Sequence, residues 1–345
     1  MKDIKVLGID LAKDVFQLHG TDATGNRVVT KRLNRGKLIE YMANTTPCLV
    51  GIEACGGSHY WARVFEKHGH TVKIMSPQFV KPYVKSNKND ARDAEAIAEA
   101  VTRPTMRFVP KKTIEQQDIL LLHRARELAM KQKIAQGNQI RGLLAEYGIV
   151  IAKGLSHLDK LPSILENDEN KLSVVSKEIF LQMYEQLKTF ASQVSYYDKK
   201  ININAAADPR CIAIQDIEGI GPITASAIVA TIGDPNVFKN GREVSAWLGL
   251  TPKQNSSGNK VILGGITKRG DRYVRKLLVH GARSVVNTCE NKTDKKNQWV
   301  ADKKKRCGYN KAAVALANKN TRVIWAMLAT GECYKKGLSH EAQVA

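Results

Sequence analysis

The stretch Lys5-Val6-Leu7-Gly8-Ile9-Asp10-Leu11-Ala12-Lys13 is an apolar run that ends on a carboxylate. β-Branched and aliphatic residues in so short a run favour a strand over a helix. Asp10 is therefore expected inside a sheet or at its edge. Its carboxylate could hold a metal ion, pair with a base or cap a turn into Lys13, and acidic partners elsewhere in the chain would decide among these roles.

The first hundred residues predict an α/β domain. Strand-like runs at 5–10, 15–19 and 27–33 are separated by short turns, which predicts an antiparallel meander of three strands. Helical segments at 36–43, 58–68 and 90–101 then alternate with strands at 48–53 and 71–75. This order is expected of an RNase H-like (RuvC-like) domain, although other α/β arrangements fit the pattern nearly as well.

Further acidic residues stand where this fold could bring them to Asp10. Glu53 ends the fourth strand, and Asp90 and Asp93 open a helix at a spacing that puts both on one face. Converging carboxylates repel one another unless a divalent cation neutralises them, and Mg²⁺ could also polarise a phosphodiester. Taken singly, Asp90 could be a helix N-cap and Asp93 a favourable first-turn charge.

The charge of the chain suits a polyanionic partner such as nucleic acid. Its 345 residues carry a net charge of +21, and residues 206–345, with 23 Lys and Arg against 11 Asp and Glu, contribute +12 of it.

The length and the 43% hydrophobic content allow two or three domains. No apolar run approaches the roughly 20 residues that span a bilayer and no signal peptide is visible, so we expect a cytoplasmic protein without membrane contact. Six scattered cysteines without a CxxC pair indicate neither a zinc module nor a disulfide framework.

Residues 111–204 predict a helical middle domain. Apolar residues recur there in an unbroken 3-4 spacing, which is a heptad seam: Phe180, Met183, Leu187, Phe190, Val194, Tyr197 and Ile201. The partner of this helix could be the earlier helix over 113–147, or the same helix of a second subunit. The sequence leaves both arrangements open.

Residues 205–345 predict a mostly α-helical domain. The turn Gly219-Ile220-Gly221-Pro222 resembles the hairpin of helix-hairpin-helix modules, in which backbone N–H groups grip a phosphate; the alternative is a tight turn with Pro222 at the first helical position. The loop Lys253-Gln254-Asn255-Ser256-Ser257-Gly258-Asn259-Lys260 gives Ser257 a possible nucleophilic role, although Ser-Ser-Gly is also a common loop sequence. Basic residues expected to contact nucleic acid are Lys13, Lys85, Lys88, Lys253, Lys260, Lys268, Arg269, Arg272 and Arg275.

Read together, these motifs resemble the DEDD transposases of bacterial insertion sequences over nearly the whole chain. The resemblance rests on the order of Gly8-Ile9-Asp10 with Lys13, Glu53-Ala54-Cys55-Gly56-Gly57, Asn89-Asp90-Ala91-Arg92-Asp93-Ala94, Gly219-Ile220-Gly221-Pro222, Leu248-Gly249-Leu250-Thr251-Pro252, Ser256-Ser257-Gly258 and Lys268-Arg269-Gly270-Asp271. It implies a RuvC-like domain over 1–110, a coiled coil over 111–204 and a transposase domain with a catalytic serine over 205–345.

The resemblance also implies an activity. Asp10, Glu53, Asp90 and Asp93 would bind Mg²⁺, and Ser257, with Ser256 as the alternate, would attack double-stranded DNA to form a covalent phosphoserine. A structured non-coding RNA would guide the choice of donor and target, and dimers would pair into tetramers in which the serine of one subunit acts beside the acids of another.

Two rival classes are open at this point. A structure-selective RuvC-like endonuclease would use the same acids with water as the nucleophile and would leave Ser257 dispensable. A nucleic-acid-binding protein without catalysis would explain the charge but would leave the converging acids without a purpose.

Overall fold

The computed structural model describes residues 3–85, 89–258 and 260–335, so that Lys88 lies outside the described residues. The chain divides into two compact units, Met1–Thr113 and Ile114–Ala345. Among the described residues, every helix is too short or too polar to span a lipid bilayer.

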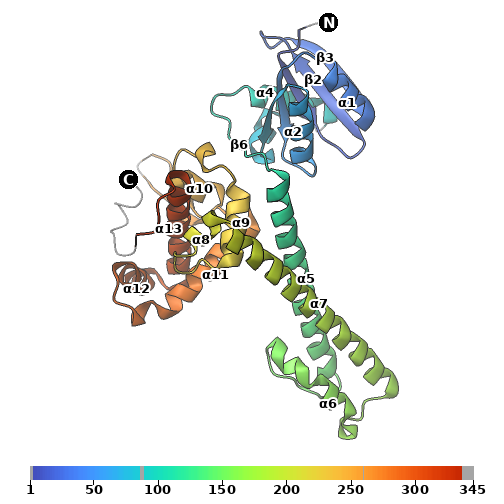
Figure 1. Cartoon of the computed structure of the whole chain (residues 1–345), viewed down its shortest axis with the longest axis vertical. Helices are drawn as coiled ribbons and strands as arrows, with labels where there is room; N and C mark the ends of the chain where they lie inside the picture. The colour runs from blue at the N-terminus through green and yellow to red at the C-terminus, as the bar shows by residue number, and fades with distance from the viewer. Residues whose placement is uncertain (1–2, 86–88, 259, 336–345) are drawn as a thin grey trace. The chain divides into compact units, whose positions relative to one another are not determined.

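The first unit is built on a mixed six-stranded sheet with the order β3-β2-β1-β4-β5-β6. Figure 1 shows this sheet together with α1, α2 and α4. The first three strands form the antiparallel meander that the sequence predicts, β4 and β5 continue parallel to β1, and β6 closes the far edge antiparallel to β5. The strands are β1 (Val6–Asp10), β2 (Val15–Thr21), β3 (Arg27–Asn34), β4 (Leu49–Glu53), β5 (Thr71–Met75) and β6 (Phe108–Val109).

Helices cover both faces of this sheet because alternate residues of each strand point to opposite sides. Leu7 and Ile9 are fully buried in the core that includes residues of α1 and α2, whereas Gly8 lies against α4 on the other face. The helices of this unit are α1 (Arg35–Ala43), α2 (Ser58–Lys67), α3 (Pro77–Val80) and α4 (Asp90–Val101). A mixed sheet of this order with helices on both faces is consistent with the predicted RNase H-like fold.

The second unit begins with two long helices, α5 (Ile114–Ala145) and α7 (Val174–Ala207), which pack lengthwise within the chain. The heptad seam of α7 is buried or half-buried along its whole length, from Phe180 to Ile201. Between the two helices, α6 (Leu161–Glu166) closes a small apolar core with Ile140, Leu144 and Leu187.

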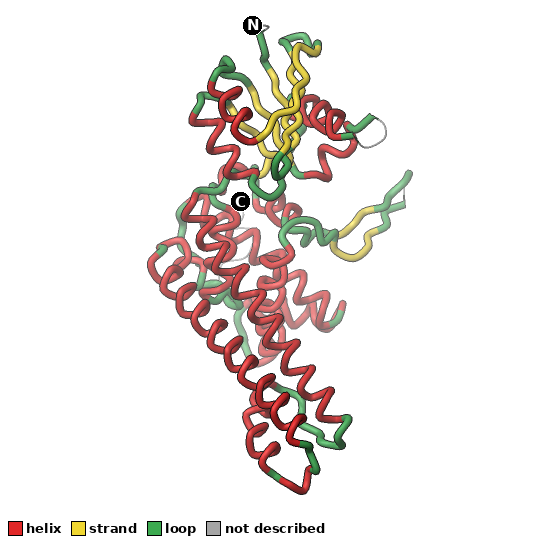
Figure 2. The backbone as a smooth tube through the Cα atoms, turned by 90° about the vertical axis from the view of Figure 1, so that its right-hand side faces the viewer, coloured by secondary structure: helices red, strands yellow, loops and turns green. Residues whose placement is uncertain are grey.

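The rest of this unit is a compact group of helices around one large apolar core. They are α8 (Pro209–Ile214), α9 (Pro222–Ile232), α10 (Gly241–Trp247), α11 (Arg272–Thr288), α12 (Lys295–Cys307) and α13 (Tyr309–Thr330). A hairpin of β7 (Pro252–Gln254) and β8 (Leu263–Ile266) extends from these helices (Figure 2). The expected border between residues 204 and 205 falls inside α7, and the division of residues 111–345 into two domains stays a prediction.

Candidate active site

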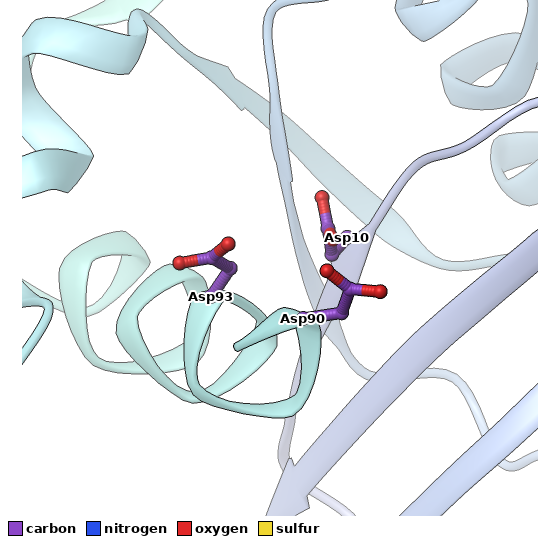
Figure 3. A group of neighbouring side chains, drawn as sticks. All are labelled: Asp10, Asp90 and Asp93. Carbon is purple, nitrogen blue, oxygen red and sulfur yellow. The ribbon is translucent and has the colours of Figure 1, made fainter. Parts of the chain in front are cut away.

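Three of the four predicted acids converge in the first unit. Each of Asp10, Asp90 and Asp93 offers a carboxylate oxygen, and these oxygens all lie within 4.8 Å of one another. Asp10 is the last residue of β1, and the two other acids stand in the first turn of α4 (Figure 3). Asn89 caps this helix by accepting a hydrogen bond from the backbone N–H of Ala91 at 3.0 Å, so Asp90 is not the N-cap.

Small residues bring α4 close enough to β1 for this arrangement. A Cβ atom on Gly8 would lie 2.2 Å from the carbonyl oxygen of Ala94, so only glycine fits there without a shift of the helix. Asp10 follows Gly8 by two positions and therefore points to the same face of the sheet. The helix then starts beside the end of the strand, which places Asp90 and Asp93 next to Asp10.

Glu53 lies on the neighbouring strand but outside this cluster of three. Ile9 of β1 pairs with Ile52 of β4 in parallel register, which puts Glu53 beside Asp10 at the same end of the sheet. Partial burial raises the pKa of the nearby Cys55 thiol, and the negative charges of Glu53 and Asp10 add to this rise. The charges of both carboxylates therefore raise the pKa of the same thiol. The role of Glu53 as a metal ligand stays a prediction.

The chemistry of the cluster fits a divalent cation. All of its donors are carboxylate oxygens, which are the ligands that Mg²⁺ prefers, at about 2.0–2.1 Å. Asp10 and Asp93 are half-buried and Asp90 is exposed, so one side of the cluster is open to solvent. The acidic cluster thus suggests a metal site.

The two predicted serines occupy different environments near the tip of the β7–β8 hairpin. The Ser256 hydroxyl oxygen accepts hydrogen bonds from the Gln254 side-chain amide at 3.1 Å and from the backbone N–H of Ile262 at 3.3 Å. Ser257 pairs through its backbone, with its carbonyl accepting from the N–H of Lys260 at 3.2 Å. The Ser257 side chain is exposed, and among the described residues no hydrogen bond involves its hydroxyl. Ser256 thus shapes the hairpin, while the hydroxyl of Ser257 faces solvent.

Most of the predicted basic residues lie on the surface. Among the described ones, the following are exposed: Lys13, Lys85, Lys253, Lys260, Lys268, Arg269 and Arg272. Lys85 forms ion pairs with Glu95 at 3.6 Å and Glu99 at 3.2 Å, so part of its charge is already balanced within the protein. Contact of these residues with nucleic acid stays a prediction.

Arg275 does not fit the expected phosphate-contacting surface. It is buried on α11, and one guanidinium nitrogen, Nη1, donates at 2.8 Å to the carbonyl oxygens of both Leu248 and Arg269. These bonds satisfy the loop that leads into α11 instead of facing solvent. We therefore correct the expectation and remove Arg275 from the set that contacts nucleic acid.

The turn at Gly219 is explained by packing between helices. Gly219 has a φ of +88°, and a Cβ atom there would lie 2.6 Å from the carbonyl oxygen of Gly281 on α11. Pro222 opens α9 at its first position and Gly221 is the N-cap. The structural role of the turn is therefore clear, and phosphate binding by Gly219 and Gly221 stays a prediction.

Comparison with known proteins decides the family. Residues 211–298 match the family described as "Transposase IS116/IS110/IS902 family", and residues 7–149 match the DEDD transposase domain of the IS110 type. The chain belongs to the IS110/IS116/IS902 family of transposases. It is 45% identical over 338 residues to the "Transposase for insertion sequence element IS1111A" of Coxiella burnetii, covering 98% of this chain and 93% of that protein.

Two further transposases align with this chain over nearly their whole length. A "Probable family 20 transposase" of Pseudomonas aeruginosa is 43% identical over 96% of this chain and 98% of its own. The "Transposase for insertion sequence element IS1328" of Yersinia enterocolitica is 36% identical over 97% of this chain and 100% of its own. The resemblance to DEDD transposases is thus confirmed, and the transposase is a DNA strand-transfer enzyme.

The transposase also contains a buried polar network that the sequence did not reveal. His123 of α5 is 1% exposed, and its ring nitrogens lie 3.0 Å from the Tyr273 hydroxyl and 3.2 Å from the Ser226 hydroxyl. Burial, with a smaller effect from the nearby Arg126 and Arg124, lowers the pKa of His123 to about 4. The neutral ring ties α5 to α9 and α11 in the unit that bears the serine hairpin. Its partners stand more than 100 positions away in the chain, so no local pattern could have found it.

Proposed function

We propose that this transposase cuts and rejoins DNA through a covalent bond between Ser257 and a DNA phosphate, under the guidance of a structured RNA. The observation that carries the proposal is the pair of environments in the hairpin. Ser256 is held by two hydrogen bonds, whereas Ser257 is exposed in a loop that also carries Lys253 and Lys260. Clustered cations neutralise a phosphate under attack and favour the alkoxide form of a serine.

The reaction conserves the number of phosphodiester bonds. The Ser257 oxygen loses its proton and attacks phosphorus, and the bond from phosphorus to one bridging oxygen breaks as that oxygen takes up a proton. A hydroxyl of a second DNA strand then attacks the phosphoserine, the new DNA ester forms and the serine is released. One ester replaces another at each step, so no external energy source is required.

The acidic residues would support these steps from the first unit. We propose that Asp10, Asp90 and Asp93, joined by Glu53, hold Mg²⁺, which supplies charge stabilisation at the phosphate and the leaving oxygen. The cluster of three carboxylates supports this assignment because it is costly without a cation. The same cluster could serve hydrolysis by water, which is the alternative function of a structure-selective endonuclease.

Trapping the intermediate separates these functions. Protein is incubated with labelled donor and target DNA and the cognate RNA, then denatured and separated on a gel. The proposal expects a labelled protein band in the wild type and in Ser256→Ala, and no band in Ser257→Ala or Asp10→Asn. Cleaved DNA without any protein-bound label, unaffected by Ser257→Ala, would identify the endonuclease instead. DNA binding without cleavage would identify a binding protein.

We propose that a structured RNA guides the choice of donor and target DNA. The net charge of +21 suits a large RNA partner, and RNA that copurifies with the protein and is required for adduct formation would support it. Adduct formation that is equally efficient after complete ribonuclease treatment would refute the guidance.

The long helices support dimerisation of the transposase. Ile114, Leu121 and Leu128 of α5 follow one another at seven-residue spacing, and each is more than half exposed. An exposed apolar stripe at this spacing fits pairing with a second copy. We propose dimers that pair into tetramers, with the serine of one subunit acting at the acids of another.

Mixed subunits test this arrangement. When Ser257→Ala and Asp10→Asn subunits are combined and allowed to exchange, a shared site leaves one intact pairing of serine and acids, and part of the adduct returns. Sites formed within one subunit would give no adduct in the mixture.

A further inference from the structure

A large basic groove lies in the second unit beside the serine hairpin. It has a volume of about 1420 Å³ and is bordered by residues of α10, α12, α13 and both strands of the hairpin. This exceeds the roughly 300–1,000 Å³ of common small-molecule sites, so a polymer fits it better than a metabolite. The hairpin contributes Pro252 from β7 and Leu263 to Ile266 from β8.

The charged side chains that line the groove are all cations. They are Arg242, Lys303, Lys311, Lys319 and Arg322, and no acidic residue is among the described residues of its lining. Five positive groups without a counter-charge repel one another, and this cost is relieved when an anion binds. The groove is therefore built for a ligand with several negative charges.

Two of these cations are poorly satisfied in the free protein. The Nε of Arg322 is buried and has no hydrogen-bond partner in the part of the chain that the structure describes. Leaving a buried donor unpaired is costly, and a phosphate oxygen in hydrogen-bond reach would recover this cost. Burial, together with the charges of Lys296 and Arg322, lowers the pKa of Lys319 to about 8, as expected for an ammonium group that lacks an anion.

An aromatic ring forms part of the same surface. The Lys319 ammonium lies 4.0 Å from the centre of the Trp299 ring, and that of Lys303 lies 5.8 Å from it. The two contacts fix the cations around an apolar surface on α12. A sugar-phosphate chain offers both partners, because its phosphates pair with the cations while its sugars lie on the ring.

We propose that this groove binds the sugar-phosphate backbone of the DNA strand that Ser257 attacks. The inference rests on the proposed function, since the hairpin that carries Ser257 forms one wall of the groove. From Pro252 to Ser257 an extended chain spans roughly 17 Å, or about five nucleotides of one DNA strand. DNA held in the groove can therefore reach the serine without a break.

The test measures binding of a fluorescein-labelled DNA duplex to the full-length protein in EDTA, so that binding is observed without cleavage. Each phosphate contact contributes a slope of about −0.9 to the plot of log K against log salt concentration. The triple variant Arg242→Gln, Lys319→Gln, Arg322→Gln is expected to lose at least about tenfold in affinity and to flatten the slope by two to three units. The single variant Lys311→Gln, at an exposed position, is expected to flatten the slope by about one unit.

Lys305→Gln is the matched control. Lys305 lies on α12 with Lys303 but is exposed and does not line the groove, so its removal is expected to change the slope by less than half as much as Lys311→Gln. Circular dichroism and thermal unfolding establish that each variant is folded. Equal slopes for the control, Lys311→Gln and a folded triple variant would overturn the proposal. A loss of binding with a labelled RNA hairpin or an acidic peptide, but not with DNA, would also overturn it.

The same variants keep this inference separate from the proposed function. Ser257→Ala is expected to bind DNA like the wild type and to form no adduct, whereas Lys311→Gln is expected to form the adduct once low salt restores binding. If Ser257→Ala still forms an adduct while the groove variants lose DNA binding, another residue is the nucleophile, and DNA binding by the groove is supported. If the groove variants bind DNA normally and Ser257→Ala abolishes the adduct, Ser257 is the nucleophile and the groove does not bind the DNA.

Discussion

Gly8 of β1 and Ala94 of α4 are in direct backbone contact: a Cβ atom on Gly8 would come within 2.2 Å of the Ala94 carbonyl oxygen. This contact fixes the height of α4 above the sheet. It also sets the separation between Asp10 at the end of the strand and Asp93 in the first turn of the helix. The acidic cluster therefore depends on a residue that has no side chain.

Gly8→Ala is expected to push α4 away from the sheet and to separate the carboxylates. Overpacking of this kind costs about 1–3 kcal/mol, and loss of the shared ligand geometry should reduce strand transfer at least about tenfold. Thermal unfolding and adduct yield measure the two effects. Gly36→Ala in α1 is the control, because the nearest described atom outside the backbone of its own helix is the Asn34 side-chain oxygen, 4.0 Å from a Cβ there. Similar losses in both variants would contradict this explanation.

The acids and the metal ion should have opposite effects on stability. Without a divalent cation, Asp10→Asn and Asp93→Asn remove repulsion among three close carboxylates, so both variants should unfold at the wild-type temperature or above it. Addition of Mg²⁺ should raise the unfolding temperature of the wild type and of neither variant. The same shift in Asp93→Asn as in wild type would exclude this cluster as the metal site.

Two other substitutions complete the metal experiment. Asp14→Asn, at an exposed position outside the cluster, is the control and should respond to Mg²⁺ like the wild type. Glu53→Gln should lose only part of the response, because Glu53 lies beside the group of three and not within it.

His123 should make the second unit sensitive to acid. Its folded-state pKa of about 4 lies below the ordinary histidine value of 6.5, so between these values the unfolded chain binds more protons and stability falls as the pH falls. The loss amounts to roughly 3 kcal/mol across this range. Chemical denaturation at several pH values, followed by tryptophan fluorescence, measures it, since Trp247, Trp299 and Trp325 lie in this unit.

His123→Gln should weaken this dependence and lower stability at neutral pH by about 1–3 kcal/mol, because Tyr273 or Ser226 loses a buried partner. His280→Gln, at an exposed position on α11, should leave the pH dependence as in wild type. An unchanged acid response in His123→Gln would show that other groups control it.

Lys319 should make DNA binding sensitive to alkali. Its pKa of about 8 in the free protein means that the ammonium loses its proton as the pH rises through 8, and a contact with phosphate is lost with it. Affinity for the DNA duplex should therefore fall between about pH 7 and pH 9 in the wild type. Lys319→Arg, which keeps its charge, should bind with much weaker pH dependence. A parallel fall in both proteins would assign the effect to another group.

The sequence predicts the parts of this protein that depend on local patterns. Alternation and turns predict the meander through β3, and the strand-end position of Asp10 with the i, i+3 pair Asp90 and Asp93 predicts the acidic cluster. The heptad seam predicts that α7 pairs along its length. Each of these features is defined by a pattern within a few residues, so the sequence alone is enough to predict it.

The remaining features depend on contacts between distant segments. Arg275 shares a helix with the exposed Arg272, and only the position of the Leu248 and Arg269 carbonyls shows that it is buried. One feature of the sequence indicates the groove. The spacing of Lys311, Lys319 and Arg322 places three cations on one face of α13. Its other wall comes from the hairpin, and no local pattern predicts that association.

We expect the hydroxyl of Ser257 to form the bond to DNA while that of Ser256 holds the hairpin. Mass spectrometry of the trapped adduct, after digestion of the protein and of the DNA, distinguishes the two hydroxyls. Fragmentation of the peptide around residues 256 and 257 should place the nucleotide on Ser257 in the wild type and in Ser256→Ala. A nucleotide on Ser256, or cleaved DNA with neither serine modified, would contradict the account.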